Sequence, residues 1–260
     1  NLRWSSMIPG IVNGQPAFDQ SLGLAMVPTW RVAFGATTGT QTIQYVNYAT
    51  GAVTGQLEIV TQRFDALDIM NPPQVAFSPD SRTIYVAVPI QGAPNMSAVM
   101  ACGTQGGSAG CMPRWRSPNL DGIVLYLLPF AAGTKVAAIT AQTVYFLEDS
   151  SMGTAGSVLN PGGVPTAASG TQLISGAQPG QNGDFYLFSG TPFATEIIAF
   201  DTPSNGEVYR YSLGGGGDTA QNALTMAVDD NGTPWLRIGV NQVKPLSLQE
   251  YRNARGATGP

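Results

Sequence analysis

Short runs of apolar residues, each broken after a few positions by Gly, Pro, Asn or Asp, recur along most of the chain. Such runs are typical of β-strands bounded by turns. The pattern predicts about a dozen strands, at 30–34, 42–48, 56–61, 74–77, 83–88, 122–128, 135–140, 143–147, 185–188, 197–200, 208–212, 224–228 and 235–240. Helical character is limited to 62–70 and to 247–254, where Ser247 and Glu250 are spaced as in a capping box. The sequence therefore predicts an all-β chain.

Two hairpin patterns recur within this series of strands. In the first, a short apolar strand meets an Asp-containing turn and the next strand carries an aromatic residue, as at 75–86 and again at 226–236. In the second, two strands flank a glycine-bearing turn, around Gly51, Gly133 and Gly206. The spacing of the repeats is irregular, so long insertions must separate them.

The hairpin sequences carry a family resemblance. Phe-Ser-Pro-Asp-Ser-Arg-Thr-Ile-Tyr-Val-Ala at 77–87 resembles the blade hairpin of YVTN-type and WD40-like β-propellers. Glu-Val-Tyr-Arg-Tyr at 207–211, followed by the segment 226–235, is similar to tectonin-type propeller repeats, although glycines at 214–217 replace the tryptophan expected between them. The resemblance implies a secreted, propeller-like binding scaffold with irregular blades and carries no catalytic residues. A β-sandwich or jelly roll is the alternative fold.

Two segments, 93–116 and 150–183, interrupt the strand pattern with many small and polar residues. Because the hairpin patterns recur on both sides of the second segment, we expect one β-rich domain over 1–260 with two long insertions. Long loops without secondary structure of their own are usually functional or disordered. We therefore expect both insertions to lie outside the core and to bind partners.

Histidine is absent, and this excludes several kinds of site. Ser-His-Asp and Cys-His catalysis need a histidine, as do His-ligated zinc and haem centres. Two cysteines are too few for an iron–sulfur cluster or a four-cysteine zinc site. We accordingly expect no metal and no cofactor. The net charge of −4, without any basic run, argues against nucleic acid as a partner.

Carboxylates are the remaining route to acid–base catalysis. Glu148 and Asp149 are adjacent, as are Asp229 and Asp230. Neighbouring residues on a strand point to opposite faces, so neither pair forms a site by itself. The simpler interpretation is that these acidic residues stabilise turns and helix or strand ends. A glycosidase-like pair of carboxylates from two separate elements remains an open alternative.

Cys102 and Cys111 enclose a spacer rich in Gly and Ser that lets their backbones approach. We predict a disulfide between them. A disulfide, few lysines and a surface rich in Thr, Gln and Asn are typical of an exported protein, located outside the cell, in the periplasm or at the cell surface. No apolar run approaches the roughly 18 residues of a membrane-spanning helix, so no membrane span is expected.

Arg114, Trp115 and Arg116 form the most unusual local cluster. Two arginines around an indole can bind an anion, a sugar or a protein surface. Alternatively, Trp115 packs beneath the disulfide loop while both arginines point into solvent. Trp235, after the Asn-Gly turn at 231–232, is a further candidate binding residue.

Three functions are compatible with these features. The leading hypothesis is an exported, non-enzymatic interaction module that serves as a subunit of a larger extracellular or envelope assembly. Only 11% of the residues are charged, and interface cores are depleted in charge. Its partners would be other protein subunits or further copies of the chain. The alternatives are a secreted carbohydrate-binding lectin, with exposed aromatic rings as platforms for glycans, and a secreted carboxylate-dependent hydrolase.

Overall fold

We analysed the protein as a computed structural model. The structure describes residues 5–33, 35–63, 73–104, 111, 113–130, 134–150, 153–165, 173–179, 184–191, 194–201, 204–212, 226–229, 234–238 and 242–245. These residues form strands and turns and no helix, which confirms the all-β prediction. Of the two predicted helices, 247–254 and most of 62–70 lie outside the described residues, whereas Gln62 and Arg63 end a strand. The described part also contains no helix of the length and apolarity that crossing a membrane requires.

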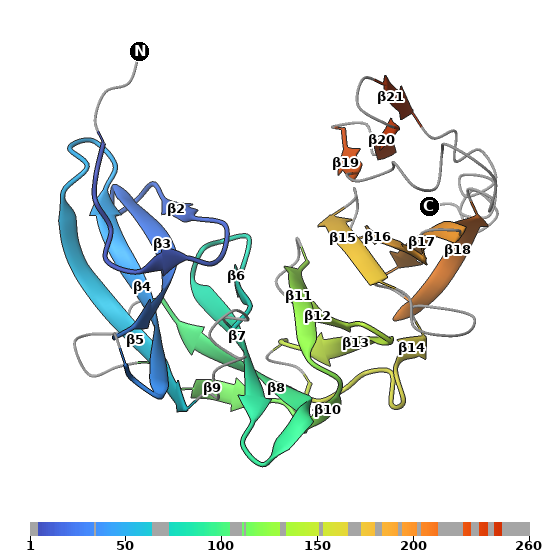
Figure 1. The fold of residues 1–260 in the computed structure, drawn as a ribbon, viewed down its shortest axis with the longest axis horizontal. Coiled ribbons are helices and arrows are strands. Elements are labelled where there is room, and N and C mark those ends of the chain that lie inside the picture. The colour runs from blue at the N-terminus through green and yellow to red at the C-terminus, as the bar shows by residue number, and fades with distance from the viewer. Residues whose placement is uncertain are drawn as a thin grey trace.

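Five antiparallel sheets follow one another along the described chain (Figure 1). The first sheet consists of β1 (Ile11–Val12), β2 (Ala17–Asp19), β3 (Leu24–Val32), β4 (Thr38–Asn47) and β5 (Val53–Arg63). The second consists of β6 (Val75–Phe77), β7 (Thr83–Ile90), β8 (Ala93–Gly103), β9 (Pro113–Arg116) and β10 (Leu120–Asp121). In the second sheet the middle strands β7 and β8 are long and the outer ones short, whereas in the first sheet the edge strand β5 is as long as its neighbours.

The third sheet consists of β11 (Val124–Pro129), β12 (Lys135–Thr140), β13 (Thr143–Glu148) and β14 (Val164–Pro165). The fourth consists of β15 (Leu173–Pro179), β16 (Asp184–Thr191), β17 (Ala194–Asp201) and β18 (Gly206–Ser212). The fifth consists of β19 (Met226–Val228), β20 (Pro234–Ile238) and β21 (Gln242–Pro245). Within these three sheets the strands pair strictly in chain order, as successive hairpins.

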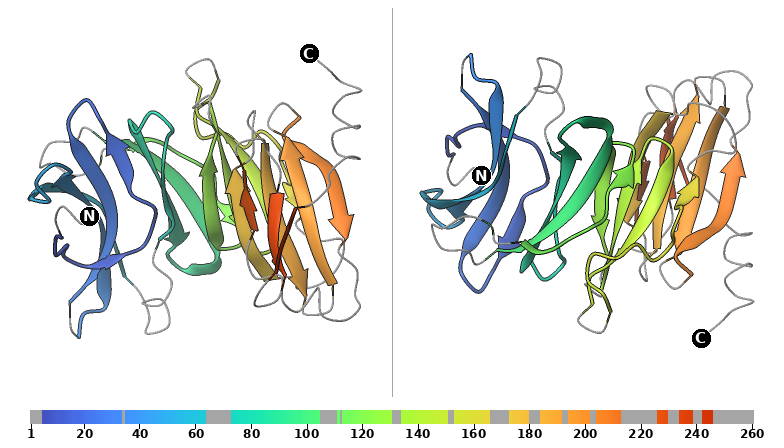
Figure 2. Two further views of the ribbon diagram at one scale, coloured as in Figure 1. Left: turned by 90° about the horizontal axis from the view of Figure 1, so that it is seen from above. Right: turned by 90° about the horizontal axis from the view of Figure 1, so that it is seen from below.

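The sheets stand side by side around an open arc, with the first sheet and the fifth sheet at its two ends (Figure 1). Edge-on views show the first to fourth sheets following one another in chain order (Figure 2). Along the inner side of the arc, β6 contacts β11, β11 contacts β15, and β15 contacts β19. The first strand of each later sheet therefore lines the centre of the arc.

Successive sheets pack face to face through apolar clusters. The cluster between the first and second sheets contains Met26, Ile43, Leu57, Ile84 and Val86. The cluster between the second and third sheets contains Tyr85, Val99, Trp115, Val136 and Leu147. Between the third and fourth sheets the rings of Phe130, Phe146, Phe185 and Phe200 pack together. Since burial of apolar area is the main favourable term in folding, these clusters hold neighbouring sheets together.

The segment 93–116, expected to be an insertion outside the core, instead forms β8 and β9. Side chains of β8 alternate between two clusters, with Ala98 and Cys102 on the first-sheet side and Val99 and Ala101 on the third-sheet side. A strand that is buried on both faces has no alternation of polar and apolar residues. This is why its sequence did not resemble a strand.

The segment 150–183 also differs from the expected insertion. It contains β14 and β15, and β15 pairs along its length with β16 of the fourth sheet. β15 reads Leu-Ile-Ser-Gly-Ala-Gln-Pro, in which glycine and proline conceal the strand pattern. Deleting 150–183 would therefore remove a paired strand, so this segment is not a dispensable arm.

β6 and β7 form the predicted hairpin, and Asp80 stabilises its turn. Asp80 accepts hydrogen bonds from the hydroxyl of Ser78 at 2.5 Å and from the backbone N of Arg82 at 3.1 Å. The hydrogen bond from Ser78 is the main reason why the pKa of Asp80 lies below its ordinary value. Ser81 adopts a positive φ of 58° at this turn.

Candidate interaction surfaces

Exposed apolar side chains gather at the two ends of the arc. Among the described residues nine large apolar side chains are exposed, and none of them belongs to the second, third or fourth sheet. They are Met7, Ile11, Val12, Phe18, Leu22, Tyr48 and Val53 in or next to the first sheet, and Trp235 and Val243 in the fifth. Scattered apolar residues are ordinary on a protein surface, whereas a concentration of them marks a site of interaction.

We call the face of the first sheet that points away from the second sheet its outer face. Strand pairing aligns Phe18, Ala25, Val46 and Val53 in one row across β2, β3, β4 and β5. Directly paired residues share a face of the sheet. Their neighbours along the strands, such as Met26, pack on the second sheet, so this row lies on the outer face.

The middle of this row is covered and its ends are open. Ile8 packs against Ala25 and Val46, whereas Phe18 is 61% exposed and Val53 is 40% exposed. Met7, next to Ile8 in the chain, is almost fully exposed. The outer face of the first sheet therefore carries an apolar patch around Ile8.

Polar side chains on the same outer face are hydrogen-bonded to one another. The hydroxyls of Thr29 and Thr42 lie 2.7 Å apart, and Nε2 of Gln44 donates to Oγ1 of Thr42 at 3.1 Å. All three side chains are buried and uncharged. A buried polar group that already has its partner adds no further desolvation cost when a protein covers the face.

The fifth sheet has an exposed apolar face of its own. Ala227, Trp235 and Pro245 are paired directly across β19, β20 and β21, and all three are exposed. Val243 is two residues before Pro245 on β21, so it lies on the same face and is exposed too. The indole Nε1 of Trp235 donates to Oδ2 of Asp229 at 2.9 Å, which orients the ring. We call this the outer face of the fifth sheet.

Comparisons with known proteins found similar structures but no similar sequence. No protein-family model and no curated protein sequence matches the chain. Kuenenia stuttgartiensis hydrazine synthase is structurally similar, with a TM-score of 0.56 and 11% identity over 88% of this chain and 57% of that one. A Bacteroides uniformis protein provisionally assigned as a 6-phosphogluconolactonase has a TM-score of 0.53 and 13% identity over 86% and 67%.

A third similar structure is the β-propeller domain of Cps50 (Swd1) from Myceliophteria thermophila. It has a TM-score of 0.51 and 14% identity, over 89% of this chain and 64% of that one. The chain has a β-propeller fold. Each of its sheets is a blade, which confirms the resemblance found in the hairpin sequences and rules out the two-sheet sandwich. The chain spans about 57 to 67% of the length of these three similar structures.

A buried carboxylate joins the second blade to the third. Asp149, which follows β13, accepts a hydrogen bond from Nε1 of Trp115 on β9 at 2.5 Å. Its other oxygen accepts a hydrogen bond from the hydroxyl of Tyr85 on β7. The side chain of Asp149 is only 3% exposed. Both donors belong to the second blade, so this carboxylate ties two blades together.

The surroundings of Tyr85 keep its hydroxyl group protonated. Burial, followed by the hydrogen bond to Asp149, raises the pKa of Tyr85 far above its ordinary value. Nη2 of Arg114 lies 3.9 Å from Oδ1 of Asp149, but its side chain is half exposed and solvent screens the pair. With both oxygens occupied by buried donors, Asp149 is placed to stabilise the propeller and not to reach a substrate.

The Arg-Trp-Arg cluster divides between core and surface. Trp115 is only 7% exposed and packs against the ring of Tyr85, so a ligand cannot reach it as a binding platform. This corrects its assignment as a binding residue. Trp115 is a core residue with exposed arginines beside it, as the alternative held, but it packs toward the third sheet and not beneath the disulfide, whose Cys102 faces the first sheet. Arg114 and Arg116 are exposed on either side, and Arg114 donates to the hydroxyl of Thr83 at 2.7 Å. The two arginines stay candidate binding residues.

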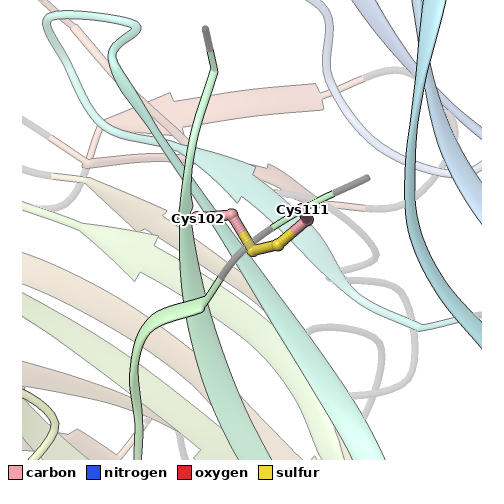
Figure 3. Close-up of a disulfide and its surroundings, with 2 residues drawn as sticks. All are labelled: Cys102 and Cys111. Carbon is pink, nitrogen blue, oxygen red and sulfur yellow. A yellow bond between two sulfur atoms is a disulfide. The ribbon is translucent and has the colours of Figure 1, made fainter. Parts of the chain in front are cut away.

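The predicted disulfide is present. Cys102 on β8 is bonded to Cys111, with their Cα atoms 5.7 Å apart (Figure 3). The backbone N of Cys111 donates to the carbonyl oxygen of Glu58 on β5 at 2.9 Å. Cys111 is therefore linked to the second blade by the disulfide and to the first blade by a backbone hydrogen bond. This bridging role could not be read from the two cysteines alone.

Sequence reasoning missed the features that tertiary packing creates. Asp149 follows an apolar strand without any motif that marks it as buried, and it was interpreted as a turn or cap acid. Phe18 and Val53 are 35 positions apart and share a row only through strand pairing. In the described part of the chain, no cluster of three or more His, Cys, Asp or Glu residues is arranged to hold a metal ion.

Proposed function

We propose that this chain is an exported, non-enzymatic interaction module, which works as a rigid subunit of a larger extracellular or envelope assembly. The observation that carries this proposal is the placement of the exposed apolar side chains. They lie on the two end blades, while the described side chains of the inner blades expose no large apolar group. A concentration of this kind is expected where other proteins bind.

The character of the outer faces supports binding of protein. The polar side chains in the middle of the first blade's outer face already have hydrogen-bond partners. Charged residues are only 11% of the whole chain, so few ions would lose their hydration in an interface. Covering these faces would therefore bury apolar surface.

Contacts between blades support the rigidity of the subunit, and the disulfide supports its export. The Asp149 tie joins the second and third blades, and Cys111 connects the second to the first. Lys135 donates to Oδ1 of Asn205 at 2.7 Å, which connects the third and fourth blades. Disulfides persist in oxidising compartments, so the Cys102–Cys111 bond favours a location outside the cytosol.

The absence of catalysis is proposed on chemical grounds. The chain has no histidine, and Asp149 is the only buried carboxylate among the described residues. Its oxygens are engaged by Tyr85 and Trp115. The secreted-hydrolase alternative would need a different pair of carboxylates with open access.

The test of this proposal is the size of the protein in its native source. Size-exclusion chromatography of untreated native material, followed by immunodetection, should show the chain eluting well above its monomer mass of 27.2 kDa. Elution as a monomer would overturn the proposal. A hydrolytic activity that disappears in an Asp→Ala or Glu→Ala variant would overturn its non-enzymatic part.

A carbohydrate-binding role is the second candidate, favoured by Trp235. Its ring is 36% exposed, and the hydrogen bond from its indole N–H to Asp229 fixes the orientation of the ring. Titration of the purified chain with a glycan panel, read by tryptophan fluorescence, tests this role. A saturable change that is lost in Trp235→Ala would favour the lectin, and no change with any glycan would exclude it.

A further inference from the structure

The disulfide lies within the contact between the first and second blades. Cys102 is fully buried and belongs to the apolar cluster between these blades, and Cys111 packs against the same cluster. Two hydrogen bonds reach this place from the first blade. The hydroxyl of Tyr45 on β4 donates to the carbonyl oxygen of Thr104 at 2.6 Å. The backbone N of Cys111 donates to the carbonyl oxygen of Glu58 on β5 at 2.9 Å.

The two hydrogen bonds differ in what fixes them to the second blade. Thr104 directly follows β8, and its backbone N donates to the carbonyl oxygen of Arg82 at 3.0 Å, so its position does not need the disulfide. Cys111 precedes β9, and the disulfide is what fixes it to β8. Since β9 also pairs with β8, the second blade stays assembled without the bond. Breaking the disulfide therefore frees Cys111 from its place beside β5 and leaves Thr104 where it is.

We propose that the disulfide is a redox-sensitive clasp between the first and second blades, which a dithiol reductant opens by attacking the sulfur of Cys111. In the oxidised protein, the clasp holds the edge strand β5 to the second blade through Glu58. In the reduced protein, the first blade keeps the apolar cluster and the hydrogen bond from Tyr45, and it moves more freely. This device goes beyond the proposed function, because it needs no partner subunit.

Access decides which sulfur is attacked. Cys102 has no exposed surface, whereas Cys111 is half-buried. A thiolate of the reductant bonds to Sγ of Cys111, and the electron pair of the broken S–S bond goes to Cys102, which takes up a proton. The second thiol of the reductant then attacks the reductant's own sulfur in this mixed disulfide, and Cys111 leaves as a thiol. The protein gains two electrons and two protons, and the dithiol becomes a disulfide.

Hydrogen exchange, read by NMR, tests whether the bond controls the contact between the blades. The full chain is labelled under native conditions for a time over which β12 and β13 stay protected in the oxidised form. Over that time, reduction should remove the protection of the Cys111 amide and speed exchange in β5 about tenfold or more. Unchanged exchange would overturn the proposal. Loss of protection in β12 and β13 together with β5 would also overturn it, because the bond would then act only on overall unfolding.

Matched variants separate the disulfide from the neighbouring hydrogen bond. Cys102→Ala/Cys111→Ala should exchange like the reduced wild type and should not respond to reductant. Tyr45→Phe removes the hydrogen bond to Thr104, so it should speed exchange in β5 in both redox states and still respond to reductant. A Tyr45→Phe variant that no longer responds would overturn the proposal, since Thr104 and not Cys111 would then transmit the effect.

Trapping of the mixed disulfide tests the direction of attack. A thioredoxin whose second active-site cysteine is replaced by serine cannot complete the reaction, so it stays bonded to the sulfur that it attacks. Peptide mapping of the trapped complex should place thioredoxin on Cys111. A mixed disulfide on Cys102, or no mixed disulfide after prolonged incubation, would overturn the proposal.

Discussion

Trp115 donates its indole N–H to Asp149 across the boundary between the second and third blades, with 2.5 Å between Nε1 and Oδ1. In the sequence, Trp115 belongs to the conspicuous Arg-Trp-Arg cluster, and Asp149 is one of several unremarkable acids. Their contact turns a candidate ligand site into part of the core. It also adds a hydrogen-bonded carboxylate to the apolar contact between the two blades.

Replacing Asp149 with alanine should strongly destabilise the propeller. The change leaves the hydroxyl of Tyr85 and the indole N–H of Trp115 buried without an acceptor. Each unpaired buried donor costs about 1–3 kcal/mol, so we expect the free energy of unfolding to fall by about 2–6 kcal/mol. Urea denaturation measures this change. Asp121→Ala, at an exposed carboxylate, should shift the free energy by less than about 0.5 kcal/mol. Equal effects of the two variants would contradict the role of the tie.

Tyr85 should make the protein sensitive to alkali. Its folded pKa is raised above the ordinary value of 10.0, so below pH 10 the phenol is protonated in both states and its contribution is complete. Above pH 10 the unfolded state loses the proton while the folded state retains it, so stability falls as pH rises. Urea denaturation from about pH 8 to about pH 11 should show a steeper loss for the wild type than for Tyr85→Phe. Parallel curves would show that Tyr85 makes no such contribution.

A methyl group at Gly39 should be poorly tolerated. A Cβ atom at this position would lie 2.0 Å from Cζ2 of Trp30, whose ring is buried and has little room to move. Overpacking of this kind costs about 1–3 kcal/mol, so Gly39→Ala should lower the thermal midpoint. Gly55→Ala in the adjacent strand is the control, because its Cβ would make only an ordinary 3.8 Å contact with Tyr45. A midpoint for Gly39→Ala equal to that of the control would contradict the packing around Trp30.

Loss of the disulfide should lower stability moderately. In the chain-entropy model, a loop of this size stabilises the native state by about 2–3 kcal/mol. Reduction of the wild type should therefore lower the urea midpoint, while the double variant Cys102→Ala/Cys111→Ala starts at the lower midpoint and does not respond to reductant. A wild-type midpoint that ignores reductant would show that the bond contributes nothing to stability.

Most of the longer strands could be predicted from the sequence, and the two long ones that were missed have separate causes. The hairpin at 75–86 follows its predicted pattern, because alternating residues and an Asp turn are local signals. β8 and β15 were missed, since burial of β8 on both faces removes alternation, and Gly and Pro interrupt β15. Local patterns report on one strand and its turns, and not on what lies above and below a sheet.

The sequence by itself determined the all-β class, the propeller resemblance and the pairing of its two cysteines, because each depends on residues close together in the chain. Tertiary structure decided what those residues do. It buried Trp115 with Asp149, aligned Phe18 with Val53 and left the end blades with apolar outer faces. These relations join residues far apart in sequence, and only the packing of successive sheets brings them together.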